Sequence, residues 1–300
     1  MKVLAAVVTY NRRVLLSRCI DHLQAQTRPA DAVLIINNAS EDGTAEMLTA
    51  RGVPFVTQAN LGSAGGWKRA IAHALEHDFD AIWLMDDDGF PDASALAKLE
   101  TALLPGVACA SSVVLCEDER DRFVFPFPYL NAARLPVLFR RPRKMHRLEE
   151  LRGEARDGTY PFAHLFNGAL ISLQAVRKIG NVEDGYFMFG DEVDYFCRLR
   201  TAGEVVSVLD AAHYHPDVSD RPYTPAKVYY YVKNSLVIHR RYFDMAGLRN
   251  ALALVAVVVR VGARNGVGAA LSYVAGSQAP AFYRAIARGM AGKVGKDFGG

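Results

Sequence analysis

The 300-residue chain has little cysteine, and its cysteines form no recognisable site. The four lie far apart in no CxxC spacing and no Cys/His ladder, at Cys19, Cys109, Cys116 and Cys197. This scarcity argues against a structural zinc site and against a disulfide scaffold. We therefore expect a protein of a reducing compartment, which places it in the cytoplasm.

Long hydrophobic runs are also missing. The longest in the C-terminal part extends from Ala251 to Val259, nine residues, whereas a membrane span needs about 20. We therefore expect no span, although an interfacial helix stays open. The apolar start at residues 3–8 has no small-residue cleavage site after it, so it indicates a buried strand rather than a signal peptide.

The composition that is present supports a folded enzyme-sized chain. Hydrophobic residues make up 51% and charged residues 22%, which excludes disorder over most of the length. Residues 221–300 hold 12 Lys and Arg against 2 Asp and Glu, whereas residues 1–220 hold 23 against 30. We expect the acidic part to hold a cation and the basic part to face an anionic partner.

The first half alternates between two periodicities. β-branched apolar runs predict strands, and apolar spacings of three and four predict helices between them. The strands are expected at 3–8, 32–36, 54–57 and 81–85, and the helices at 13–25, 44–51, 66–77 and 93–104, the last with Asp92 as N-cap. This alternation predicts an α/β fold with a mostly parallel sheet and helices on both faces, where ligands bind beyond the carboxyl ends of strands.

Residues 117–163 change character. They hold five prolines, many charged residues and weak periodicity. We expect an inserted loop or subdomain there, with regular structure resuming at residues 166–172.

Three consecutive carboxylates, Asp86, Asp87 and Asp88, follow the fourth predicted strand directly. Like charges crowded at a strand end are unfavourable unless a cation or hydrogen-bond donors offset them. Carboxylate oxygens are preferred ligands of Mg²⁺, which also accepts phosphate oxygens. A solvated turn that caps the next helix is the alternative.

A glycine-rich stretch lies between the third strand and its helix. It reads N-L-G-S-A-G-G-W-K-R from Asn60 and contains Gly65, Gly66 and Lys68. Glycines at a helix start allow a close approach of backbone to phosphate. The spacing is neither a Walker A motif nor GxGxxG, and a flexible loop is the alternative.

Polar side chains also follow the first two strands. T-Y-N-R begins at Thr9 and includes Asn11 and Arg12, and N-N-A-S-E-D-G-T begins at Asn37. These amides and hydroxyls suit a base and a ribose, whereas capping and turn chemistry is the alternative reading. For Asp42-Gly43-Thr44 a turn is the preferred reading.

Two later motifs could complete a site. Asp191, Glu192 and Asp194 begin a helical pattern after an aromatic string, which indicates a general base or merely acids favoured by the helix dipole. His213 and His215 could add an imidazole to a metal shell.

In order along residues 3–240, these motifs resemble the inverting family 2 glycosyltransferases of GT-A fold. The ordered set is T-Y-N-R, N-N-A-S-E-D-G-T, N-L-G-S-A-G-G, D-D-D, F-N-G-A-L, G-D-E-V-D-Y and H-Y-H. The later string V-Y-Y-Y-V-K-N resembles a segment of bacterial rhamnosyl- and galactofuranosyltransferases, and D-D-D with G-D-E favours the galactofuranosyl type. The absence of Q-x-x-R-W argues against a processive synthase.

The resemblance implies a role for each motif. The nucleotide would be held by Thr9, Asn11, Arg12 and Asn37, and the diphosphate-sugar path would be lined by Asn60, Gly65, Gly66 and Lys68. Mg²⁺ or Mn²⁺ would be held by Asp87, Asp88 and His215, with Asp86 toward the ribose or sugar. The acceptor would lie against Asn167, Gly168 and Asp194. Glu192 is the base by register, and Asp191 stays an alternative.

The implied reaction moves a sugar, galactofuranose being favoured, from a UDP-linked donor to a glycan or lipid-linked acceptor with inversion. Transfer of rhamnose from dTDP-rhamnose, a nucleotidyltransferase and a non-catalytic sugar-nucleotide-binding paralogue are the alternatives. Asn37 departs from the family's usual Asp, which loosens the uracil assignment. No nucleic acid partner is expected.

The expected domains are a catalytic domain at 1–240, with the insertion at 117–163, and a basic helical region at 241–300. We expect that region to dock on the anionic inner face of the plasma membrane. Packing on the core or on a dimer partner is the alternative.

Overall fold

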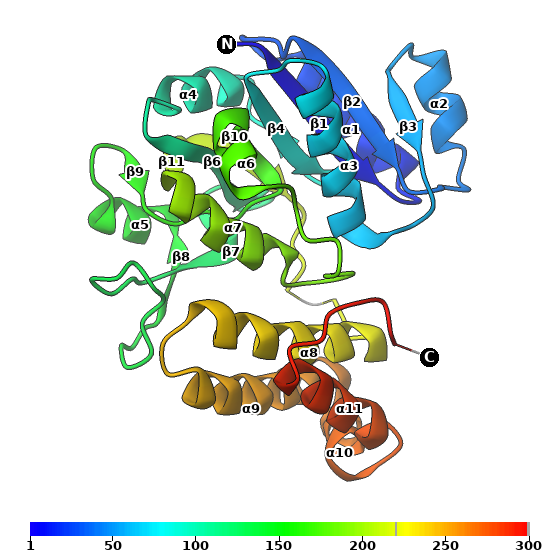
Figure 1. Ribbon diagram of the computed structural model, residues 1–300, viewed down its shortest axis with the longest axis vertical. Coiled ribbons are helices and arrows are strands. Elements are labelled where there is room, and N and C mark those ends of the chain that lie inside the picture. Colours follow the sequence, from blue (N-terminus) through cyan, green and yellow to red (C-terminus); the bar gives the residue numbers. More distant parts are fainter. Residues whose placement is uncertain (220, 299–300) are drawn as a thin grey trace. The chain divides into compact units, whose positions relative to one another are not determined.

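The computed structural model describes residues 1–219 and 221–298, in which the chain forms two compact units (Figure 1). Unit 1 comprises residues 1–61, 65–182 and 196–217, and unit 2 comprises 62–64, 183–195 and 218–300. Each unit has its own hydrophobic core. The expected domain boundary at residue 240 falls within a helix of unit 2, and the division into domains stays a prediction.

Unit 1 is built on a mixed sheet. Within the described residues the sheet has eleven strands, and its main path runs β3-β2-β1-β4-β10-β6-β11-β5, with β7, β8 and β9 paired off that path. The strands are β1 (Val3–Thr9), β2 (Ala32–Asn37), β3 (Phe55–Thr57), β4 (Ala81–Asp86), β5 (Phe90–Pro91), β6 (Val107–Cys116), β7 (Arg122–Pro128), β8 (Lys144–Arg147), β9 (Thr159–Tyr160), β10 (Asn167–Ser172) and β11 (Glu204–His215).

Strands β1 to β4 are parallel, as the sequence predicts, because helices connect them. Strand β10 runs antiparallel to both β4 and β6, and β6 is parallel to β11. The helices of the chain are α1 (Arg13–Gln24), α2 (Thr44–Ala50), α3 (Gly62–Glu76), α4 (Ala95–Ala102), α5 (Leu148–Glu154), α6 (Leu173–Ile179), α7 (Asp191–Ala202), α8 (Pro225–Tyr242), α9 (Ala246–Asn265), α10 (Val267–Ala275) and α11 (Ala279–Met290).

The core of unit 1 follows from the predicted patterns. Strand β1 is buried at every position, and α1 covers the sheet with the face that the spacing predicts, Leu16, Cys19, Ile20 and Leu23. The α/β fold expected from the sequence, with parallel strands connected by helices, is therefore present, together with C-terminal helices.

Two local expectations were wrong. The helix expected at 66–77 starts earlier, because α3 begins at Gly62 and takes up the glycines. Helix α4 begins after an N-cap at Ser94 rather than at Asp92, since the Asp92 carboxylate instead accepts hydrogen bonds from the backbone N–H and hydroxyl of Ser94, at 3.1 and 2.7 Å.

The segment 117–163 contains more regular structure than its sequence indicates. It forms β7, β8, α5 and β9, and aromatic and aliphatic side chains from it make a separate core cluster in unit 1. Strand β7 has phenylalanine at every second position, Phe123, Phe125 and Phe127, with a valine and two prolines at the positions that follow them. The prolines concealed this pattern, because proline is rare inside strands.

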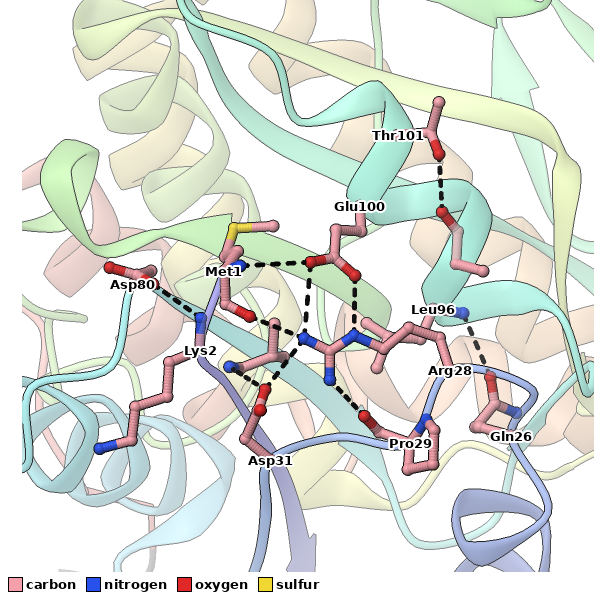
Figure 2. Close-up of polar contacts among 12 residues, drawn as sticks. Met1, Lys2, Gln26, Arg28, Pro29, Asp31, Asp80, Leu96, Glu100 and Thr101 are labelled. Carbon is pink, nitrogen blue, oxygen red and sulfur yellow. Dashed lines mark hydrogen bonds and ion pairs between the residues drawn. The ribbon is translucent and has the colours of Figure 1, made fainter.

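The amino-end edge of the sheet is closed by an ion cluster (Figure 2). Arg28, in the loop after α1, contacts both the Glu100 carboxylate of α4, at 2.8 Å, and the Asp31 carboxylate, at 3.0 Å. It also donates to the carbonyls of Met1 and Pro29. The Asp31 carboxylate accepts from the Val3 backbone N–H at 2.8 Å, so the cluster fastens the start of β1.

Unit 2 is a helical assembly in which α8 packs against both α9 and α11, and α10 packs against α9 (Figure 1). Helix α8 begins at a Thr224 N-cap followed by proline, a pattern typical of helix starts. The hydrophobic core of unit 2 includes Tyr229, Tyr230, Val257 and Phe282. Tail helicity, expected from the sequence, is thus present.

Candidate functional site

The topology of unit 1 brings the predicted residues to one edge of the sheet. Thr9, Asn37 and Asp86 end the parallel strands β1, β2 and β4. Strand β10 runs the opposite way, so its first residue, Asn167, lies opposite Met85 at the same edge. Residues distant in sequence therefore meet where parallel α/β sheets bind ligands.

Asp87 turns toward the loop after β1. Its carboxylate accepts hydrogen bonds from the Thr9 hydroxyl at 2.7 Å, the Tyr10 backbone N–H at 3.3 Å and the Arg12 guanidinium at 2.9 Å. The side chain is buried, and burial raises the pKa of the carboxyl above its usual value, while the Arg12 charge partly offsets this rise. Asp87 thus ties the first-strand loop to the end of β4.

Asp88 joins two basic groups. One carboxylate oxygen lies 2.8 Å from the Arg12 guanidinium, and the other lies 3.0 Å from Nε2 of His215 at the end of β11. Both Asp88 and His215 are about 4% exposed. Arg18 approaches from α1, donating to the backbone carbonyl of Asp88 at 3.2 Å and pairing with Glu117 at 2.7 Å.

The chemistry of this cluster fits a divalent cation in part. Carboxylate oxygen and imidazole nitrogen are both common ligands of divalent metals, and Asp88 already faces His215. In residues 1–219 and 221–298, however, no group of three or more His, Cys, Asp or Glu side chains converges as a metal shell. Of the three expected ligands, the structure brings together Asp88 and His215, whereas Asp87 binds the first-strand loop.

His213 lies deeper than His215. It is fully buried, and burial lowers its pKa to about 3, so the imidazole is neutral. A Cβ at Gly89 would come within 2.2 Å of its Nε2, and a Cβ at Gly168 within 3.2 Å of its Nδ1. The glycines therefore make room for this ring, and it is His215 rather than His213 that contacts Asp88.

Asn11 joins the loop after β1 to the loop after β2, and Asn37 fixes the loop that follows it. The Asn11 side-chain oxygen accepts from the Glu41 backbone N–H at 2.7 Å, and the Asn37 side-chain oxygen accepts from the Ser40 backbone N–H at 3.0 Å. Asp42 accepts from Thr44, as expected for a turn. These bonds fix the loops after β1 and β2, and the predicted contacts of both asparagines with a nucleotide stay a prediction.

The glycines of α3 have a packing role. A Cβ at Gly66 would lie 2.5 Å from Cγ1 of Val8, so glycine allows α3 to approach β1 closely. A Cβ at Gly65 would meet Leu61 at 2.4 Å. Asn60 is partly exposed and Lys68 is exposed. The expected position of these four residues along a diphosphate is not tested by the packing.

Unit 2 holds the acidic start of α7. The Asp191 carboxylate is buried and accepts from the Ser63 hydroxyl at 3.0 Å, a partner that the sequence did not indicate. Burial raises the pKa of Asp191 to about 7, the Ser63 bond opposes the rise, and the neighbouring Glu192 charge adds to it. Glu192 itself is partly exposed.

Asp194 has strong partners in unit 2. Its carboxylate accepts from the Tyr242 hydroxyl at 2.6 Å and lies 3.6 Å from the Arg241 guanidinium. These contacts tie α7 to α8, which is a stabilising role; the expected acceptor contact of Asp194 stays a prediction. Asn234 of α8 donates to the carbonyls of Met188 and Phe189 at 2.9 and 2.7 Å, so it fixes the aromatic string before α7.

Sequence reasoning missed an aromatic wall beside His215. The Phe125 ring lies edge-on to the His215 ring, with centroids 5.6 Å apart, and also lies 5.7 Å from the His164 ring. The period-2 phenylalanines of β7 were the only signal for it.

The chain is similar in sequence to known glycosyltransferases. A family model described as glycosyl transferase family 2 matches residues 5–162. The chain is 37% identical over 235 residues to the galactofuranosyltransferase GlfT1 of Mycobacterium tuberculosis (strain CDC 1551 / Oshkosh), covering 73% of this chain and 71% of that protein. It is 33% identical over 224 residues to GlfT1 of Mycolicibacterium smegmatis, covering 73% and 72%.

Solved structures show the same fold. A mannosyltransferase of Pyrobaculum calidifontis in complex with GDP-Man and Mn²⁺ aligns with a TM-score of 0.56 at 17% identity, covering 95% of this chain and 79% of that one. Residues 1–349 of S. aureus TarS in complex with UDP-GlcNAc align with a TM-score of 0.56 at 12% identity, covering 98% and 82%. With its strand-end acidic cluster, its matching family model and relatives above 30% identity, the chain belongs to glycosyl transferase family 2.

Proposed function

We propose that this glycosyltransferase moves galactofuranose from a UDP-linked donor to a hydroxyl of a glycan or lipid-linked glycan, with inversion at the anomeric carbon. The relatives above 30% identity that are described above are galactofuranosyltransferases, which supports the sugar. This resemblance also makes transfer from dTDP-rhamnose the weaker alternative.

One observation carries the proposal: Asp88, at the carboxyl end of β4, faces both His215 and Arg12. Asp88 and His215 are the residues that would hold a divalent cation, with Asp87 as the further ligand inferred from the motif. When bound, the cation would stabilise the negative charge of the departing diphosphate. Mn²⁺ is proposed over Mg²⁺, because the neighbouring mannosyltransferase structure contains it.

Arg12 is the cationic side chain that we expect to contact the phosphates of the donor. Its side chain is 42% exposed while it contacts both carboxylates, so the guanidinium has a face available to phosphate. Thr9 and Asp87 hold the backbone from which Arg12 projects. Asn11, Asn37, Asn60, Gly65, Gly66, Lys68 and Asp86 complete the proposed donor contacts, and Asn167, Gly168 and Asp194 those to the acceptor.

The proton of the acceptor hydroxyl is taken by the acidic pair of α7. We assign the base to Glu192, which is partly exposed and matches the family motif by register. Asp191 is buried and accepts a hydrogen bond from Ser63, and burial raises its pKa to about 7. A carboxylate with this pKa is the alternative base. The attacking oxygen then forms the new glycosidic bond as the bond to the diphosphate breaks.

Asp88→Asn tests the proposal. The carboxamide keeps the shape and removes the charge, so we expect turnover of UDP-galactofuranose to fall by at least about a hundredfold while the circular dichroism spectrum is kept. Asp92→Asn, in the next turn, is the matched control and should retain turnover. A thermal-shift series with UDP-, dTDP- and GDP-sugars and Mn²⁺ reports donor binding separately.

Wild-type turnover in Asp88→Asn and in enzyme treated with EDTA would overturn the role of the cluster. A thermal shift with dTDP-sugars but none with UDP-sugars would overturn the donor.

A further inference from the structure

Helix α9 exposes an apolar stripe to solvent. Leu248, Leu252, Val255 and Val259, hereafter the α9 stripe, recur at spacings of four, three and four, which places them on one helix face. Their exposed fractions range from 39% to 63%, values that large aliphatic side chains rarely show together on a soluble surface. Helix α10, packed next to α9, likewise exposes Val267, Leu271 and Val274.

The opposite face of α9 is already used. Val257 and Val261 are about 1% exposed and pack in the core of unit 2 with Tyr229 and Phe282. Arg249, at the start of α9, is buried in an ion pair with Asp244 at 2.6 Å. The α9 stripe is therefore the face that the fold of unit 2 leaves uncovered.

The length of α9 raises the question of a membrane span. Among residues 1–219 and 221–298, α9 is the one helix long and apolar enough to cross a membrane, with a mean hydropathy of 1.6 over its most apolar window. The sequence expectation that no span is present rested on a nine-residue run, which the helix exceeds. A span would, however, have to strip α9 from α8 and carry Arg249 into lipid, so the contacts favour an in-plane position.

Cations accompany the stripe. Arg260 and Arg264 follow it on the last turns of α9, and their guanidinium groups lie over the rings of Tyr231 and Tyr223, at 5.8 and 4.9 Å from the ring centroids. The helical spacing places Arg260 beside the stripe and Arg264 nearer the opposite face. Residues 221–300 as a whole hold 12 basic and 2 acidic side chains. Apolar side chains bordered by arginine and tyrosine are typical of helices that lie at a lipid headgroup boundary.

We propose that the α9 stripe docks in the interface of an anionic bilayer, with Arg260, which borders the stripe, against lipid phosphates. Charge complementarity selects this occupant over a second copy of the chain, since pairing two such faces would bring two strongly basic helical segments together. Docking rests on the proposed function, because it would bring the enzyme to the bilayer that holds a lipid-linked acceptor.

Vesicle co-sedimentation of the full chain tests the docking. We expect binding to vesicles of phosphatidylcholine with phosphatidylglycerol and little binding to phosphatidylcholine alone. Leu252→Gln with Val255→Gln should weaken binding by about tenfold or more. Arg260→Gln should weaken it about fivefold, and only on the anionic vesicles, whereas Arg264→Gln, on the side of α9 that contacts Tyr223, should weaken it less. Leu104→Gln, an exposed leucine of unit 1, is the matched control.

Equal vesicle binding by wild type and the Leu252→Gln/Val255→Gln variant would overturn the proposal. So would sedimentation equilibrium that shows a dimer which this variant dissolves, combined with no vesicle binding by the wild type. Thermal shift with UDP and Mn²⁺ is measured in the same samples: a normal shift in a variant that no longer binds vesicles separates a docking defect from a failure of the proposed function.

Discussion

Two arginine–carboxylate clusters stand at opposite edges of the same sheet. Arg12 contacts Asp87 and Asp88 at the carboxyl end, and Arg28 contacts Asp31 and Glu100 at the amino end (Figure 2). Each cluster pairs one arginine with two carboxylates. Burial raises the pKa of Asp87, whereas the pKa of Asp31 is lowered, chiefly by the hydrogen bond from the Val3 backbone N–H.

Burial explains the difference. The side chains of Asp87 and Asp88 are 4% and 5% exposed, and those of Asp31 and Glu100 are 39% and 25% exposed. Water screens the amino-end cluster, which therefore adds little beyond fastening β1. The carboxyl-end cluster holds charge that water does not stabilise, and such charge attracts a further cation or a charged ligand.

The comparison extends furthest to Asp191, a buried carboxylate that accepts a hydrogen bond from a neutral hydroxyl. Asp191 is held by Ser63, and its pKa is about 7 in the folded chain against 3.8 for the free group. Since the folded pKa is raised, its stabilising contribution is full below about pH 4 and is lost as the pH rises to about 7.

We therefore expect Asp191→Asn to flatten the decline of unfolding free energy between about pH 4 and pH 7, by on the order of 3–4 kcal/mol. Urea unfolding of both proteins across that window measures the difference. Parallel curves for the two proteins would show that folding does not raise the pKa of Asp191.

The second largest change in stability is expected when the Arg12 guanidinium is removed from the buried cluster. Arg12→Gln leaves two buried carboxylates without their guanidinium, so we expect a loss of about 2 kcal/mol of unfolding free energy, moderated by the exposure of Arg12. Added Mn²⁺ should recover more of the stability in the variant than in the wild type. The exposed neighbour Arg13→Gln serves as control, and equal stability of both variants would contradict the expected role.

The amino-end cluster should respond less. Arg28→Gln removes two partly exposed ion pairs, with Asp31 and Glu100, and we expect a loss of about 1 kcal/mol that shrinks at high salt, with unchanged transfer activity. Chemical denaturation at low and high ionic strength measures it. A loss as large as that of Arg12→Gln would remove the distinction between the two edges.

The smallest effect belongs to Asp31. Its lowered pKa means that its contribution is present above about pH 4 and is lost as the pH falls through the folded pKa. Asp31→Asn should therefore reduce acid destabilisation, by about half a kcal/mol once its exposure is considered. Acid titrations monitored by tryptophan fluorescence would show this, and an increased acid sensitivity would contradict it.

Much of the first half of the fold could be predicted. The strand and helix periodicities located β1, β2 and β4 within a residue or two, because each buried strand is a continuous apolar run. The positions of Thr9, Asn37 and Asp86 at one edge followed from the parallel order. Strands β6 and β11 were not predicted, since their pairing depends on partners far away in sequence.

The sequence predicted which residues belong to the candidate site, but not which side chains contact one another. Asp88 and His215 were selected by motif and do meet. That Arg12 bridges Asp87 and Asp88, or that Ser63 holds Asp191, was invisible, because side chains separated by many residues reveal no distance in a sequence.

The sequence alone determined the α/β class, the acidic strand end, the basic tail and the family, since these depend on residue order and local periodicity. Only the tertiary structure decided which carboxylates pair with an arginine side chain and which apolar side chains remain exposed. Asp87 and Asp191 are both buried aspartates, yet one reaches Arg12 and the other reaches a serine hydroxyl. The physical reason is that charge compensation and burial are properties of neighbours in space, and the packing of the helices and strands sets those neighbours.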